Sequence, residues 1–64
     1  MTIREYAKTI GFEVVGKLKR LPDVYYGMDN KHHYPLYIDD AGNEYCGDYK
    51  SDLWCIITPD GGVR

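Results

Sequence analysis

The chain has little of what most recognisable protein classes need. Its 64 residues include only two cysteines, one tryptophan and one phenylalanine. No apolar run approaches the ~18 residues of a membrane-spanning helix, and no basic, apolar leader opens the chain, so we expect a cytoplasmic protein. Two cysteines are too few for a disulfide-rich scaffold, and in that compartment Cys46 and Cys55 should remain thiols.

Motifs for catalysis are also scarce. Ser51 is the only serine, and no nucleophile motif surrounds it. Gly61 and Gly62 precede no predicted helix and therefore form no phosphate-binding loop. The adjacent Asp39 and Asp40 belong to a turn-forming segment, where aspartate is favoured for local hydrogen bonding. A chain of this length has little room for a cleft that buries a substrate, so we expect neither an enzyme nor a cofactor.

The composition indicates one small globular domain. A hydrophobic content of 44% and a charged content of 28% are ordinary, and 64 residues suffice for a single core. The net charge of −2 hides an asymmetry: residues 1–22 hold five basic and two acidic residues, whereas residues 23–64 hold three basic and eight acidic. The chain therefore presents two electrostatic faces, or its turns and strands are simply rich in aspartate.

A helix is predicted over residues 2–10. Thr2 and Glu5 have the spacing of a capping box, and Gly11 is placed to end the helix. The apolar residues between them form one stripe at helical spacing: Ile3, Tyr6, Ala7 and Ile10.

Residues 12–21 fit either a helix or a strand. The β-branched pair Val14-Val15 and the glycine that follows favour a strand, which Pro22-Asp23 is expected to end. Residues 23–31 are then predicted as a loop or an irregular edge strand.

Two hairpins are predicted in the rest of the chain. The segment "DDAGN" suits a turn with Gly42 in the left-handed position, which pairs Ile38 with Glu44, Tyr37 with Tyr45 and Leu36 with Cys46. A four-residue loop, "YKSD", then pairs Cys46 with Cys55, Tyr45 with Ile56 and Asp48 with Leu53. The predicted fold is α+β: one N-terminal helix on an antiparallel sheet of three or four strands.

Alternation of side chains divides this sheet into two faces. One face is predicted to carry Leu36, Ile38, Cys46, Leu53, Cys55 and Ile57, and the other Tyr37, Tyr45, Trp54 and Ile56. One helix can cover only one face. We assign the aliphatic and cysteine face to the helix, which leaves the aromatic face open.

An open aromatic face predicts a non-catalytic protein-binding module, an inhibitor or regulator, because exposed aromatic clusters rimmed by charge are typical interface anchors. The partner would be a protein with a basic surface or a second copy of the chain. Alternatively, these rings are covered by Tyr25, Tyr26, Met28 and the strand predicted over residues 12–21, or the cross-strand tyrosines only stabilise the hairpin. The predicted contact residues are Tyr37, Tyr45, Trp54, Asp39, Glu44, Asp48 and Asp52.

In size and acidic charge the chain is similar to small accessory proteins of phages and mobile elements. Some of these, including the anti-CRISPR class, inhibit nucleic-acid enzymes by occupying basic grooves with acidic side chains. The likeness implies an inhibitory role, by analogy of size and charge alone.

One alternative function is DNA binding. The stretch "IREYAKTIGFEVVGKLKRL" resembles a helix-turn-helix in the spacing of Ala7 and Gly11, although Leu18 and Leu21 each fall one place late. The resemblance implies that the following hairpin is a wing. The residues that would contact nucleic acid are Lys17, Lys19 and Arg20.

A second alternative is structural zinc. His32, His33, Cys46 and Cys55 supply four suitable ligands, but their spacing lacks the C-x-x-C and H-x₃₋₅-H pairs typical of such sites. We therefore expect no metal. A strained disulfide between the two opposed cysteines is the other alternative.

Overall fold

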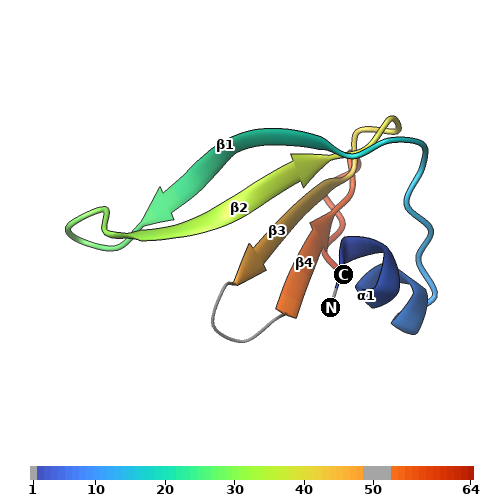
Figure 1. The fold of residues 1–64 in the computed structure, drawn as a ribbon, viewed down its shortest axis with the longest axis horizontal. Coiled ribbons are helices and arrows are strands. Elements are labelled where there is room, and N and C mark those ends of the chain that lie inside the picture. The colour runs from blue at the N-terminus through green and yellow to red at the C-terminus, as the bar shows by residue number, and fades with distance from the viewer. Residues whose placement is uncertain (1, 49–52) are drawn as a thin grey trace.

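In the computed structural model, which describes residues 2–48 and 53–64, one short helix packs against a four-stranded antiparallel sheet (Figure 1). The strands lie in chain order, β1-β2-β3-β4. This arrangement confirms the predicted α+β class. The elements are α1 (Ile3–Thr9), β1 (Lys19–Tyr26), β2 (His32–Ile38), β3 (Glu44–Asp48) and β4 (Leu53–Ile57).

The helix α1 begins at the predicted capping box. The N–H of Glu5 donates to Thr2 Oγ1 at 3.1 Å, and the N–H of Thr2 donates to the Glu5 carboxylate at 3.3 Å. Gly11, with φ of 74°, follows the C-cap and allows the chain to turn away. The predicted helix is confirmed to within one residue at each end. In the described part of the chain, no helix has the length and apolar character needed to cross a membrane.

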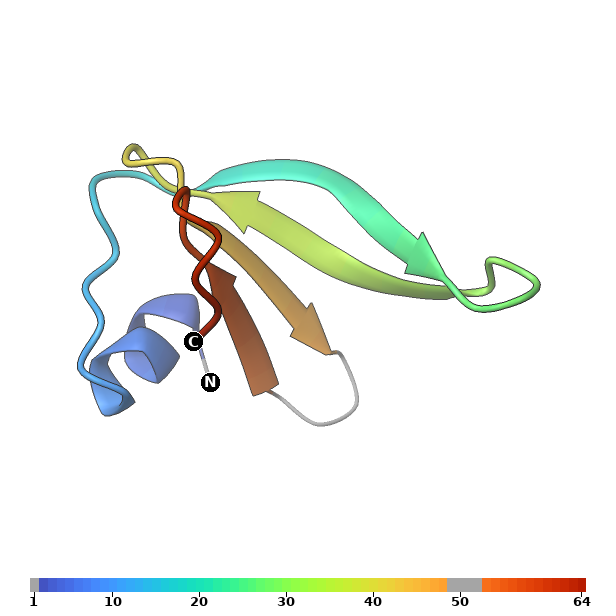
Figure 2. The same ribbon diagram turned by 180° about the vertical axis from the view of Figure 1, so that it is seen from behind.

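The segment after α1 is a linker of irregular structure, so the strand predicted over residues 12–21 is wrong up to residue 18, and β1 begins only at Lys19. Its backbone bonds to the turn between β2 and β3. The N–H of Val15 donates to Asp39 Oδ2 at 3.2 Å, and the N–H of Asp40 donates to the Val15 carbonyl at 2.9 Å. Lys17 N–H donates to Asp40 Oδ2 at 3.2 Å. The linker therefore runs from α1 to the far end of the sheet (Figure 2).

Two prolines lie at the positions where the pairing of the strands changes. Pro22 was expected to end β1, but the strand continues past it with a register shift between Leu21 and Val24. A bulged edge strand tolerates proline because one side of the strand needs no N–H donor. Pairing of β2 with β3 stops at Leu36, next to Pro35, which has no N–H. Beyond that point β1 and β2 pair only with each other and form a projecting arm (Figures 1 and 2).

Both predicted hairpin registers are confirmed. β2 pairs with β3 through Ile38 and Glu44, and β3 pairs with β4 through Cys46 and Cys55. Gly42 has a φ of 88°, the left-handed value predicted for the turn. The predicted loop at residues 49–52 lies outside the described residues.

The helix covers the opposite face of the sheet from the one predicted. The core consists of Ile3 and Ala7 from α1, Val14 from the linker, and Tyr45 and Ile56 from the sheet. Tyr45 and Ile56 are both fully buried. The face predicted to be open and aromatic is therefore the covered one. Tyr45 can be buried because its hydroxyl donates to Asp39 Oδ2 at 2.7 Å, so the buried hydroxyl has a hydrogen-bond partner.

Asp39 is the most connected polar residue of this core and is only 5% exposed. Its Oδ1 accepts the N–H groups of Ala41 and Asn43 at 3.0 and 2.9 Å. Its Oδ2 accepts Val15 N–H, Asn43 Nδ2 and the Tyr45 hydroxyl at 3.2, 2.9 and 2.7 Å. Burial alone would raise the pKa of Asp39, but the hydrogen bonds from Asn43, Tyr45 and the backbone lower it to about 2.

We predict that Asp39→Asn lowers the free energy of unfolding by about 2–4 kcal/mol, because an amide cannot accept all the donors that a buried carboxylate accepts. Urea denaturation measures this change. Asp29→Asn, at an exposed turn, is the matched control and should change stability by less than about 0.5 kcal/mol. Equal stability of the two variants would contradict the assignment.

The pH dependence of stability should show the same group. The folded pKa of Asp39, about 2, lies below its ordinary value of 3.8. Its contribution is therefore complete above about pH 5 and is lost as the pH falls toward 2. Asp39→Asn should flatten the profile of Tm against pH in this window. Asp23 and Asp60, whose pKa values are also lowered by hydrogen bonds, contribute to the slope in both proteins. Parallel profiles for wild type and variant would contradict this prediction.

Candidate functional site

The aromatic residues predicted as partner contacts lie on the covered face. Tyr45 is fully buried, and Tyr37 and Trp54 are half-buried against the core. Their rings meet edge to face, with centroids 6.1 Å apart. The Trp54 ring lies over Gly47, where an added Cβ would be 2.4 Å from a ring carbon. These aromatic side chains therefore close one end of the core.

Of the predicted acidic rim, the structure describes the side chains of Asp39 and Glu44. Asp39 is buried and bonded within the chain, and Glu44 is half-buried on the face opposite Tyr45. Asp52 and the side chain of Asp48 lie outside what the structure describes. The predicted contact set is thus corrected, since two of its members, Tyr45 and Asp39, are inaccessible to a partner. A sequence signal was present: Asp39 is two residues from Tyr37, which opposes Tyr45, so alternation places the carboxylate and the hydroxyl on one face.

The basic residues of the DNA-binding alternative do not form one surface. The described residues contain no second helix after α1, so the helix-turn-helix is wrong. Lys19 and Arg20 are neighbours in β1 and point to opposite faces of the sheet. Arg20 pairs with Asp23 at 2.5 Å and stacks over the Tyr37 ring at 5.3 Å.

The four candidate zinc ligands are not brought together. Cys46 and Cys55 oppose each other in the middle of β3 and β4, whereas His32 and His33 lie on the projecting arm. Across residues 2–48 and 53–64 there is no group of three or more histidine, cysteine or acidic residues that could hold a metal ion. His33 instead contacts Asp23, with Nδ1 3.0 Å from the carboxylate.

The two cysteines are free thiols and half-buried. Burial, with a smaller effect of the neighbouring Cys55, raises the pKa of Cys46 above its ordinary value. A thiol held in its protonated form is a poor nucleophile and metal ligand at neutral pH, and it behaves as a small apolar side chain. Cys46 is therefore a packing side chain of the sheet.

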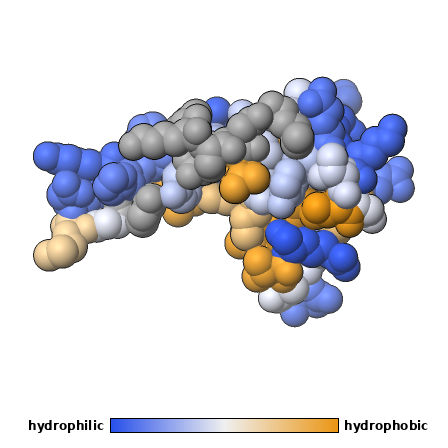
Figure 3. All heavy atoms as spheres, turned by 90° about the horizontal axis from the view of Figure 1, so that it is seen from below, coloured by the Kyte–Doolittle hydropathy of each residue, from blue (hydrophilic) through white to orange (hydrophobic). Residues whose placement is uncertain are grey.

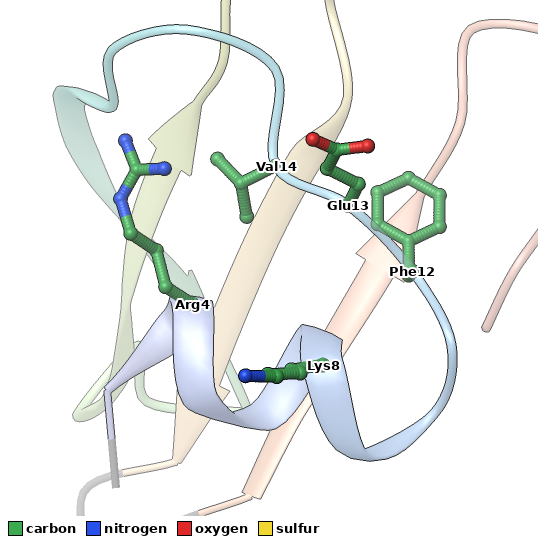
Figure 4. Close-up of a pocket in the computed structure, with 5 residues that line it drawn as sticks. All are labelled: Arg4, Lys8, Phe12, Glu13 and Val14. Carbon is green, nitrogen blue, oxygen red and sulfur yellow. The ribbon is translucent and has the colours of Figure 1, made fainter.

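Two shallow hollows lie on the side of the molecule that carries α1. One, of about 400 Å³, is lined by residues that include Arg4, Tyr37 and Trp54. The other, of about 330 Å³, is shown in Figure 4, with residues from α1 facing the start of the linker. Its lining mixes charges of both signs, and Arg4 already donates to the Gly16 carbonyl at 2.6 Å. The lining of this second hollow is Arg4, Lys8, Phe12, Glu13 and Val14.

The opposite face of the sheet, here called the open face, faces away from α1. By register it is mainly apolar, with Lys19 and Glu44 at one end of the strands and Asp48, the register partner of Leu53, at the other end. Leu53 is 60% exposed, Ile57 37% and Val63 69%. By strand register its apolar residues are Leu21, Leu36, Ile38, Cys46, Leu53, Cys55, Ile57 and Val63. No described element packs over them, and in the view from below, hydrophobic residues gather in the middle of the molecule rather than at its two ends, apart from the tip of the arm (Figure 3).

The outer edges of β1 and β4 are protected, unlike the open face. The outer edge of β4 is occupied by the C-terminal residues: Ile56 and Arg64 exchange backbone hydrogen bonds of 3.2 and 2.8 Å. The outer edge of β1 carries Pro22 and the register shift. Both devices disfavour the addition of another strand.

We predict that Gly47→Ala destabilises the fold by about 1–3 kcal/mol, because the new methyl group must displace the Trp54 ring. A double-mutant cycle, in which the stability of each variant is measured by chemical denaturation, tests whether the Trp54 ring causes this loss. In a Trp54→Leu background the same glycine substitution should cost much less. An equal cost in both backgrounds would mean that the ring is not the constraint.

Comparison of the chain with models of protein families, with curated proteins and with solved structures found no match in any of the three.

Proposed function

We propose that the chain is a non-catalytic protein-binding module that contacts its partner through the open face. The observation that carries this proposal is the placement of aliphatic and thiol side chains on a face that no described element covers. Exposed apolar patches of this kind are costly in water, and in monomeric proteins they commonly mark interaction sites.

The chemistry of the open face indicates the kind of partner. A flat layer of four strands offers area rather than depth, which suits a protein surface better than a small molecule. Its centre is apolar, so the matching surface should be apolar too, and the basic partner predicted from the sequence is not required. Cys46 and Cys55 fit this face as reduced thiols, so we place the protein in the cytoplasm.

Site-specific photocrosslinking tests the proposal. A benzoylphenylalanine at Leu53, on the open face, should give a discrete covalent adduct with a protein in the cells of origin. The same probe at Val15, which is 46% exposed on the linker, is the matched control and should give none. Adducts of equal yield from both positions, or none from Leu53, would contradict the proposal.

We also predict that Ile57→Arg greatly reduces the adduct from Leu53, because a buried guanidinium without a partner is costly at an apolar interface. Ile10→Arg should leave the adduct unchanged, since Ile10 is similarly exposed, at 40%, but follows α1. Circular dichroism and thermal melting establish that both variants are folded. A folded Ile57→Arg variant that forms the adduct at the wild-type yield would exclude the open face.

A further inference from the structure

We infer that the partner on the open face is a second copy of this chain, packed face to face about a two-fold axis. This inference rests on the proposed function and specifies the partner. Association at the sheet edges is disfavoured by Pro22, the bulge and the C-terminal residues, so two copies can meet most readily through this face.

The open face has two full rows of residues across the four strands. The inner row is apolar throughout and consists of Leu21, Leu36, Cys46 and Cys55. The outer row contains two isoleucines and two opposite charges, in the order Lys19, Ile38, Glu44 and Ile57. Neither Lys19 nor Glu44 forms an ion pair with the described residues of its own chain.

Consider a two-fold axis that runs parallel to the strands and lies between β2 and β3. It brings each row of one copy to face the same row of the second copy. It places β1 of one copy over β4 of the second copy, and β2 over β3. The inner rows then meet as an apolar layer, with Leu36 of each copy over Cys46 of the other. In the outer row, Lys19 comes within one strand spacing, about 4.8 Å sideways, of Glu44 in the second copy. The axis makes this pair twice.

This charge arrangement is what identifies the occupant. An unrelated partner would have to supply an acidic group for Lys19 and a basic group for Glu44 at matching positions. The chain itself supplies both, in the same row and therefore at the same height along the axis. Isologous packing of one patch on itself is the commonest mode of association among soluble oligomers.

The size of the face sets the expected affinity. Four strands span about 19 Å, and the open face would bury roughly 500 Å² per copy, near the lower limit for specific interfaces. We therefore expect a reversible dimer whose Kd lies in the micromolar range.

Sedimentation equilibrium of the whole chain, over a concentration series up to roughly 1 mM, tests the inference. Lys19→Glu and Glu44→Lys should each raise the dimer Kd about tenfold, because each brings like charges together twice. The double variant K19E/E44K restores opposite charges and should return the Kd to within about threefold of the wild type. Lys31→Glu, at the exposed turn of the arm, is the matched control and should leave the Kd unchanged.

Each outcome of this experiment is decisive. A monomer at every concentration, or a double variant as weak as the single ones, overturns the dimer. If Glu44→Lys does not fold, Lys19→Glu at its exposed position still tests the charge pair, and an unchanged Kd overturns it. A monomer whose Leu53 probe forms an adduct with a different protein leaves the proposed function standing. A monomeric chain whose Leu53 probe forms no adduct would contradict both the dimer and the proposed function.

Discussion

The carboxylate of Asp39 is the constraint on which the rest of the structure depends. It joins the linker, which is distant in sequence, to its own hairpin: it bonds the linker through Val15, the turn through Asn43, and β3 through Tyr45. A buried charge is tolerated only when its oxygens are fully hydrogen-bonded, and here each of them accepts at least two donors. The carboxylate in turn allows the Tyr45 hydroxyl to be buried.

The hydrogen bond between Asp39 and Tyr45 determines which face of the sheet is turned toward the core. With its hydroxyl bonded, the Tyr45 ring becomes the centre of the core, and α1 and the linker close over it. A single short helix cannot cover both faces of four strands, so the aliphatic face is left to solvent. The proposed binding surface is therefore a consequence of which face Asp39 stabilises. Pro22 and the C-terminal residues protect the outer edges of β1 and β4, and Pro35 lies where the pairing of β2 with β3 ends and the arm begins.

Local signals in the sequence were sufficient for most of the fold. The capping box of Thr2 and Glu5 places the helix, and the turn at Gly42 sets a register that the second hairpin continues. These features depend on a few neighbouring residues. The start of β1 could not be predicted in the same way, because the linker bonds to a turn more than twenty residues away.

The candidate site was misplaced for a related reason. Hydropathy ranks Leu36, Cys46 and Ile57 as better core residues than Tyr45, so the aliphatic face was assigned to the helix. That ranking gives no weight to a tyrosine hydroxyl with a buried acceptor, although alternation already placed Asp39 on the same face. The residues predicted for each face were correct. The helix, however, covers the face that was predicted to be open.

The adjacent residues Ile56 and Ile57 report on the two faces and give the most direct test of the account. Their methyl groups can be followed by NMR in dilute protein with a soluble paramagnetic agent. The structure predicts strong relaxation enhancement at Ile57, on the open face, and little at Ile56, beneath α1. Strong enhancement at Ile56 together with protection of Ile57 would contradict it.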